Sequence, residues 1–185
     1  SVWGVVDENE TGIFLRSVFS EAINSGLKVC TFKATEYWCN INDTNAFKKV
    51  QFDLLSGKAT RKIPFVASNI FTKSSVPSGN FVIVPPVFFG NNVQIESGAV
   101  IGPFAVIGEG SLIARGSKIS DSVLFKSVYV SSKCNISGAI LSEGVSVKKG
   151  AQILEGAVIG KECLIGEECV IGEGVSVWPN KTIEN

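Results

Sequence analysis

The chain has 185 residues, of which 17 are Lys or Arg and 17 are Asp or Glu, so its formal net charge is zero. Because neither sign of charge is segregated, and because no apolar run approaches the roughly 20 residues of a membrane span, we expect neither a nucleic-acid partner nor a membrane partner. Five cysteines, an odd number, in a sequence without a secretory signal predict a reducing, cytoplasmic location.

The first predicted elements are a helix and a strand. The segment Phe14–Asn24 places apolar residues at helical spacing, which predicts an amphipathic helix that ends before Gly26. The next segment, Leu27–Phe32, alternates apolar and polar residues and contains β-branched ones, which predicts a strand. A single strand needs a partner, so we expect this part to be a fragment of a larger α/β layer.

A second helix is predicted over residues 45–56, with Asp43 or Thr44 as its N-cap and Gly57 at its end. The polar segment that follows is predicted to be a linker. The chain therefore divides into an α/β fragment at residues 1–58, a linker at residues 59–82 and a final domain at residues 83–185.

The final domain is a repeat. From Ile83 to Ile183 an apolar residue returns with a period of six, provided that two units, starting at Ile119 and Ile136, have five residues. A hexapeptide period with an apolar lead residue predicts a parallel β-helix, with three units in each coil and about six coils stacked roughly 4.8 Å apart. The fold class is therefore mainly β.

The repeat also assigns places to its small residues. Glycines recur at the second and fourth positions, where we expect corners with unusual backbone angles. The fifth position is small or β-branched, and Cys134, Cys163 and Cys169 all occupy it. We therefore interpret these cysteines as buried packing residues rather than as metal ligands or a disulfide.

Two short motifs carry a family resemblance. The stretch Tyr37-Trp38-Cys39-Asn40 lies upstream of the repeats, and the chain nears its end with Trp178-Pro179-Asn180-Lys181-Thr182-Ile183-Glu184. Together with the repeats, these motifs resemble the C-terminal portion of sugar-nucleotide pyrophosphorylases, especially bacterial mannose-1-phosphate guanylyltransferases, which make GDP-mannose. The resemblance covers about residues 11–185, and it implies that the β-helix is left-handed.

The resemblance also implies roles for the turn before the second helix. Tyr37, Trp38 and Asp43 correspond to a region that lies near substrate, and Asn40 stands where the family has an Asp that helps to hold Mg²⁺. Asn brings no charge to a cation that favours carboxylates. The alternative is structural: Tyr37 and Trp38 pack against a sheet, while Asn40 and Asp43 fix a turn through side-chain to backbone hydrogen bonds.

Three functions are consistent with these sequence features. In the first, the chain is the C-terminal portion of a nucleotidyltransferase whose glycine-rich catalytic loop, with its Arg and Lys, lies in a missing N-terminal portion. The sequence starts at Ser1 and contains no Met, which favours a piece of something longer, and we expect no catalytic residue and no cofactor in this chain alone.

In the second, the chain is a non-catalytic regulatory or scaffold subunit. In both cases we expect the β-helix to form homo-oligomers, because the end coils of a solenoid expose apolar ladders unless they are capped. The third function is a hexapeptide-repeat acyltransferase. Those enzymes generally use a His base, and this sequence has no His.

Overall fold

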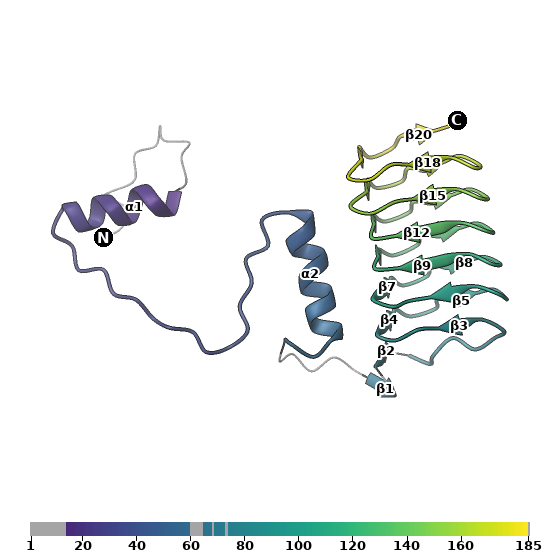
Figure 1. Cartoon of the computed structure of the whole chain (residues 1–185), viewed down its shortest axis with the longest axis horizontal. Coiled ribbons are helices and arrows are strands. Elements are labelled where there is room, and N and C mark those ends of the chain that lie inside the picture. The colour runs from purple at the N-terminus through teal and green to yellow at the C-terminus, as the bar shows by residue number, and fades with distance from the viewer. Residues whose placement is uncertain (1–13, 60–64, 68, 73, 185) are drawn as a thin grey trace. The chain divides into compact units, whose positions relative to one another are not determined.

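The computed structural model describes residues 14–59, 65–67, 69–72 and 74–184. The chain forms two compact units, Ser1–Glu36 and Tyr37–Asn185. Figure 1 shows the elements in chain order. Among the described residues, no helix is long and apolar enough to cross a bilayer.

The first unit contains helix α1 (Phe14–Asn24), as the apolar spacing predicts. Its end is a glycine turn: Gly26 has φ +74°, and the Leu27 N–H donates to the carbonyl of Ala22 at 2.9 Å. Val18 and Ala22 are buried, whereas other members of the same apolar stripe, such as Ile23, are exposed.

The predicted strand Leu27–Phe32 is wrong. The segment is irregular, and its apolar side chains are exposed: Leu27 is 44% exposed, Val29 40% and Phe32 92%. Strand backbone needs hydrogen-bond partners, and the described residues of this unit supply no second strand. The described chain before β1 contains two helices and no strand.

The second unit begins with helix α2 (Thr44–Leu55) and continues as a parallel β-solenoid of three sheets. Sheet A contains β1 (Phe65–Ala67), β2 (Ile70–Thr72), β4 (Val87–Phe89), β7 (Ala105–Ile107), β10 (Val123–Leu124), β13 (Ile140–Leu141), β16 (Val158–Ile159) and β19 (Ser176–Val177). Sheet B contains β3 (Val82–Ile83), β6 (Val100–Ile101), β9 (Lys118–Ser120), β12 (Asn135–Ser137), β15 (Gln152–Ile153) and β18 (Val170–Ile171). Sheet C contains β5 (Gln94–Ile95), β8 (Leu112–Ile113), β11 (Tyr129–Val130), β14 (Ser146–Val147), β17 (Leu164–Ile165) and β20 (Thr182–Ile183).

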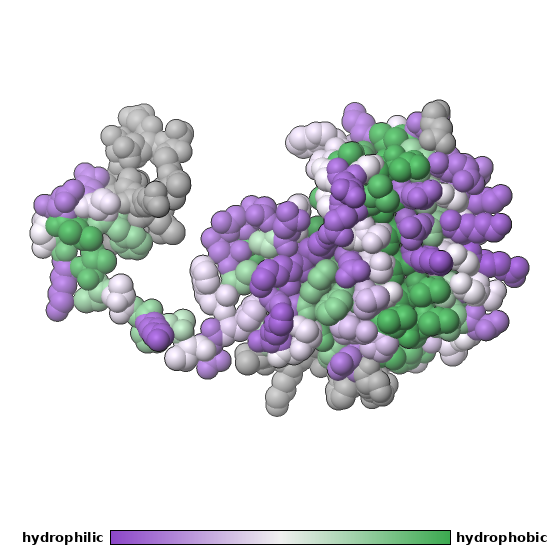
Figure 2. Space-filling view, in the orientation of Figure 1, coloured by the Kyte–Doolittle hydropathy of each residue, from purple (hydrophilic) through white to green (hydrophobic). Residues whose placement is uncertain are grey.

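The strands stack in about six turns, and every pairing between described strands is parallel except that of β1 with β2. The segment 59–82, predicted as a linker, contributes to this stack, because β2 pairs in parallel with β4. The solenoid therefore starts before Ile83. The hydrophilic side chains that project from the edge opposite α2 (Figure 2) lie on the turns between sheets C and B.

The two shortened units are confirmed by the register of sheet B. Ile101 pairs with Ile119, which pairs with Ile136, and Ile136 pairs with Ile153. Each shortened unit forms the corner that leads from sheet B to sheet A, so the missing residue is removed from a turn and the ladder keeps its register. The lead residues of these strands point into the solenoid and are fully buried. Burying one such side chain stabilises the fold by roughly 1.5–3 kcal/mol.

The fifth-position residues form a second buried layer, as predicted. Cys134, Cys163 and Cys169 are free and buried. The serines at this position are buried too, and they bind the backbone of the next coil. For example, Ser117 Oγ donates to the carbonyl of Ser131 at 2.7 Å and accepts from the N–H of Cys134 at 3.1 Å. These bonds satisfy hydroxyls that would otherwise be costly to bury.

The glycines serve two different purposes. Fourth-position glycines such as Gly110 have a positive φ, which is +67° there, as predicted for corners. Among the second-position glycines, Gly102 also has a positive φ, of +100°, whereas Gly108 does not. At Gly108 a Cβ would lie well inside van der Waals distance of the carbonyl carbon of Phe125, so this glycine is required by the close approach of the next coil. The sequence pattern suggested one explanation for both positions.

Candidate functional site

The candidate site is centred on helix α2 and the outer face of sheet A. The helix begins as predicted, because the carboxylate of Asp43 accepts a hydrogen bond from the N–H of Ala46 at 2.7 Å. This bond satisfies one of the free N–H groups of the first helical turn. It also means that the local role of the Asp43 carboxylate is capping.

Helix α2 is fixed to the solenoid by two aromatic contacts. Phe47 stacks on Phe125 with ring centroids 5.9 Å apart, and Phe52 packs on Phe104 at 5.3 Å. Aromatic pairs at such separations contribute roughly 0.5–1.5 kcal/mol beyond the area they bury. The two pairs hold the helix at two points along its length.

Lys48 adds a polar contact between helix α2 and the solenoid. The Lys48 ammonium donates to the carbonyl of Gly138 and to the carboxylate of Glu155, both at 2.7 Å, and its side chain is only 12% exposed. Because the lysine is largely buried, losing either acceptor would leave a poorly solvated charge. The contact therefore ties the helix to the corner between sheets B and A.

The turn upstream of α2 is attached to the helix through Asp53. This carboxylate is buried, and it accepts hydrogen bonds from the Tyr37 hydroxyl at 2.9 Å and from the Lys49 ammonium at 2.5 Å. The Lys58 ammonium forms an ion pair with the same carboxylate, with Nζ 3.4 Å from Oδ1 of Asp53. The hydrogen bond from Lys49 is the main cause that lowers the pKa of Asp53, with the bond from Tyr37 acting in the same direction. Desolvation, followed by the bond to Asp53, raises the pKa of Tyr37.

The structure places the four predicted site residues in different environments. Tyr37 is half-buried and bound to Asp53, whereas Trp38 is 76% exposed and does not pack against a sheet as the structural alternative supposed. Asp43 caps α2, as that alternative did suppose. Asn40 is exposed, and the contact it receives is the Cys39 thiol on its backbone oxygen, at 3.7 Å. Their roles in substrate and metal binding stay predictions.

Within the described parts of the chain, no group of three or more His, Cys, Asp or Glu side chains could hold a metal ion. The chemistry at the turn agrees with this finding. A neutral, exposed amide at Asn40 and a carboxylate at Asp43 that already caps a helix make a poor donor set for Mg²⁺.

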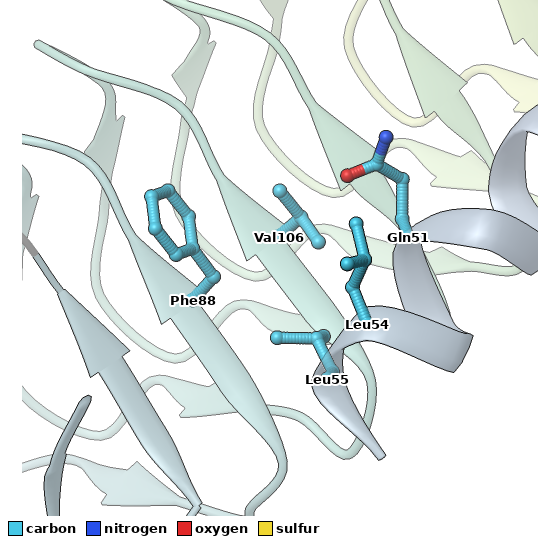
Figure 3. Close-up of a pocket in the computed structure, with 5 residues that line it drawn as sticks. All are labelled: Gln51, Leu54, Leu55, Phe88 and Val106. Atoms are coloured by element: carbon cyan, nitrogen blue, oxygen red, sulfur yellow. The ribbon is translucent and has the colours of Figure 1, made fainter. Parts of the chain in front are cut away.

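A groove runs between α2 and sheet A (Figure 3). Gln51, Leu54 and Leu55 of the helix face Phe88 of β4 and Val106 of β7 across a cavity of about 130 Å³. Gln51 and Val106 also line a larger hollow of about 360 Å³, which extends to the corner between sheets A and C. The two spaces are therefore neighbours beside α2; the smaller is lined mainly by apolar side chains, and the larger also by charged ones.

Sequence reasoning missed Asp53, Lys48 and the aromatic pairs. Among these residues, only Phe125 could have been identified from the sequence pattern. In the repeat frame it occupies the second position, where neighbouring coils have Gly or Ser, as at Gly108 and Ser142. A bulky aromatic at such a corner points to a contact outside the solenoid.

The fold and these motifs define a hexapeptide-repeat protein with a left-handed β-helix. Residues 83–185 match the family model of the GMPPB C-terminal domain, and this match covers more than half of the chain. The chain therefore belongs to this family of sugar-nucleotide pyrophosphorylase C-terminal domains, which confirms the resemblance seen in the sequence.

Two solved structures are similar to this chain. A point mutant of perosamine N-acetyltransferase from Caulobacter crescentus, in complex with CoA and GDP-perosamine, is 16% identical, with a TM-score of 0.58; the match covers 85% of this chain and 69% of that one. WeeI from Acinetobacter baumannii is 17% identical, with a TM-score of 0.43, and the match covers 75% of this chain and 64% of that one. At 16% identity, the likeness to the perosamine N-acetyltransferase shows the fold alone. Comparison with curated protein sequences finds no match.

Proposed function

We propose that this chain is the C-terminal portion of a sugar-1-phosphate nucleotidyltransferase of the mannose-1-phosphate guanylyltransferase type. The parent enzyme would join GTP and mannose 1-phosphate, forming GDP-mannose and releasing pyrophosphate. The observation that carries the proposal is the family match over residues 83–185. The motif that begins at Tyr37 supports it independently, because it precedes the repeats as it does in the enzymes that the chain resembles.

The chain's own part in this function is to support the catalytic portion. Phe47, Phe52 and Lys48 attach α2 to sheet A, and Asp53 attaches the turn at Tyr37 to α2. An upstream catalytic portion joined at this turn would therefore be anchored to the solenoid. The solenoid in turn would assemble with further copies through its end coils, which expose apolar ladders.

The reaction's Mg²⁺ and its phosphate-binding groups are assigned to the upstream portion. The poor donor set formed by Asn40 and Asp43 supports this division.

A second candidate is a non-catalytic regulatory or scaffold subunit. Asn40, which stands where the resemblance places an Asp, favours it, because decayed catalytic residues distinguish such subunits from enzymes. An acyltransferase function has less support, since this chain contains no His to serve as the general base of that chemistry.

One assay separates the two main candidates. The 185-residue chain and the native-length product of its gene are each incubated with GTP, mannose 1-phosphate and Mg²⁺, and GDP-mannose is measured. We expect product from the native-length protein only. Absence of product from both would favour the regulatory subunit, and product from the 185-residue chain would contradict the assignment of the chemistry to the upstream portion.

A further inference from the structure

The larger hollow beside α2 has a composition that the support role leaves unexplained. Its floor is formed by strands β7 and β10 at Val106, Val123 and Leu124, and the Leu124 side chain itself is buried in the solenoid. Its walls carry polar side chains from two elements: Gln51 from α2, and Glu109, Lys126 and Glu143 from the corner between sheets A and C. At about 360 Å³, the hollow is large enough for a small molecule.

The three charged side chains form a column. Ile107, Leu124 and Leu141 are paired in sheet A, so Glu109, Lys126 and Glu143, each two residues further on, occupy equivalent positions in successive coils. Neighbouring coils are separated by about 4.8 Å. The two carboxylates therefore lie on either side of the lysine, which pairs with Glu143 at 3.3 Å.

An exposed aromatic ring lies next to this column. Phe125 is 40% exposed, although one contact of its ring is the stack on Phe47. The equivalent corner positions in the flanking coils are Gly108 and Ser142, which have no bulk to cover the ring. The hollow therefore combines an aromatic surface with hydrogen-bonding groups of fixed spacing.

We propose that this hollow binds one neutral hexose unit. The C–H face of a pyranose ring suits an aromatic surface, and its hydroxyls are donors for Glu109 and Glu143 and partners for the Gln51 amide. The two carboxylates would repel a phosphate, and Lys126 disfavours a cationic ligand. A neutral ligand avoids both repulsions, and a ring rich in hydroxyls can use the hydrogen-bonding groups of the hollow.

The inference goes beyond the proposed function. The hollow lies on the solenoid and α2, and it uses none of the residues that the family resemblance associates with substrate. It would give the support domain a sugar site of its own, and it stands whether the native-length protein is an enzyme or a regulatory subunit.

The test is an NMR titration of the ¹⁵N-labelled 185-residue chain with methyl α-D-mannopyranoside. We expect saturable shifts at the amides of Gln51, Gly108 and Phe125. A ligand of about thirteen heavy atoms in an open site implies a dissociation constant in roughly the millimolar range. GDP-mannose is titrated in parallel, because it carries the same hexose attached to a diphosphate.

Two conservative variants test the column. Glu109→Gln and Glu143→Gln each replace a charged acceptor with a neutral side chain of the same size at the solvent-facing rim, so neither should disturb the fold. Each is expected to weaken binding about tenfold, which corresponds to the loss of a hydrogen bond to a charged group. Glu173→Gln, an exposed carboxylate on the corner between sheets B and A, is the matched control and should bind like the unmodified chain.

Four outcomes would overturn the proposal. They are shifts that do not saturate, saturable binding that survives both column variants, binding of GDP-mannose without binding of the methyl glycoside, and binding of tetramethylammonium in place of the sugar. Because none of these readouts measures product formation, failure of the nucleotidyltransferase assignment would leave the sugar site standing.

Discussion

The solenoid and the segment Leu27–Phe32 carry similar sequence signals and have opposite structures. Both alternate apolar and polar residues and contain β-branched side chains. In the solenoid, each such segment pairs with the equivalent segment one coil away, as Ile119 pairs with Ile136. The segment Leu27–Phe32 has no such neighbour among the described residues, and its apolar side chains are exposed. Alternation predicts a strand only where the chain also supplies a partner.

The largest expected difference between the two regions comes from removing one apolar side chain in each. Ile136→Ala should lower the free energy of unfolding by about 2–5 kcal/mol, because it opens a cavity in a fully buried ladder. Val29→Ala, at an exposed position, should change it by less than about 0.5 kcal/mol. Urea unfolding monitored by circular dichroism measures both. Equal effects would contradict the contrast between the regions.

Substitution of one glycine in each region, Gly108 and Gly26, tests the same contrast. Gly108→Ala should destabilise the solenoid by about 1–3 kcal/mol, since the new Cβ would meet the backbone of Phe125. At Gly26 the added Cβ meets nothing within 4 Å, so Gly26→Ala has only the strain of a φ of +74°, about 1 kcal/mol. Thermal unfolding of the two variants compares the cost of a steric clash at position 108 with the cost of backbone strain at position 26. A Gly108 variant as stable as the original chain would refute the close-approach explanation.

A smaller effect is expected where α2 meets the solenoid. Lys48→Met removes the donor to Gly138 and Glu155 and should weaken the docking of α2 by about 1–2 kcal/mol. The measurement is amide exchange in α2, which should become faster while exchange in sheet B is unchanged. Lys161→Met, at an exposed ion pair, is the control and should have almost no effect. No change in α2 exchange in the Lys48 variant would show that the aromatic contacts hold the helix alone.

The smallest effect concerns Asp53 and depends on pH. The folded state lowers the pKa of Asp53, so its contribution to stability is present above the pKa of the unfolded chain and is lost as pH falls through the folded-state pKa. Asp53→Asn should therefore cost about 1 kcal/mol at pH 7, and the difference from the unmodified chain should shrink below about pH 4. Melting temperatures at about pH 7 and about pH 3, on either side of the ordinary carboxyl pKa, test this. A difference that grows in acid would have the wrong sign.

The sequence predicted most of the solenoid because every coil repeats the same local solution. The period of six located the buried ladder, and the two shortened units starting at Ile119 and Ile136 were visible as a break in that period. The fifth-position cysteines were assigned correctly for the same reason, since their positions are set by the frame.

The site was less predictable, because its contacts join residues that no repeat relates. Lys48 reaches Gly138 across 90 positions, and the helical pattern of α2 does not indicate which corner of the solenoid receives it. Asp53 lies in a predicted helix, and the helical pattern does not indicate that its carboxylate accepts a hydrogen bond from Tyr37, 16 positions upstream. Such contacts are tertiary, and local patterns in a single sequence do not predict which distant residues meet.

Helix α2 and the solenoid form one structural unit, whereas the chain between Leu27 and Glu36 does not belong to it. Hydrogen exchange of the unmodified chain, followed by mass spectrometry, tests this most directly. We predict that the amides of Phe47–Leu55 are protected and that those of residues 27–36 exchange at close to the rate of an unfolded peptide. Exchange in α2 as fast as that in residues 27–36 would contradict the claim.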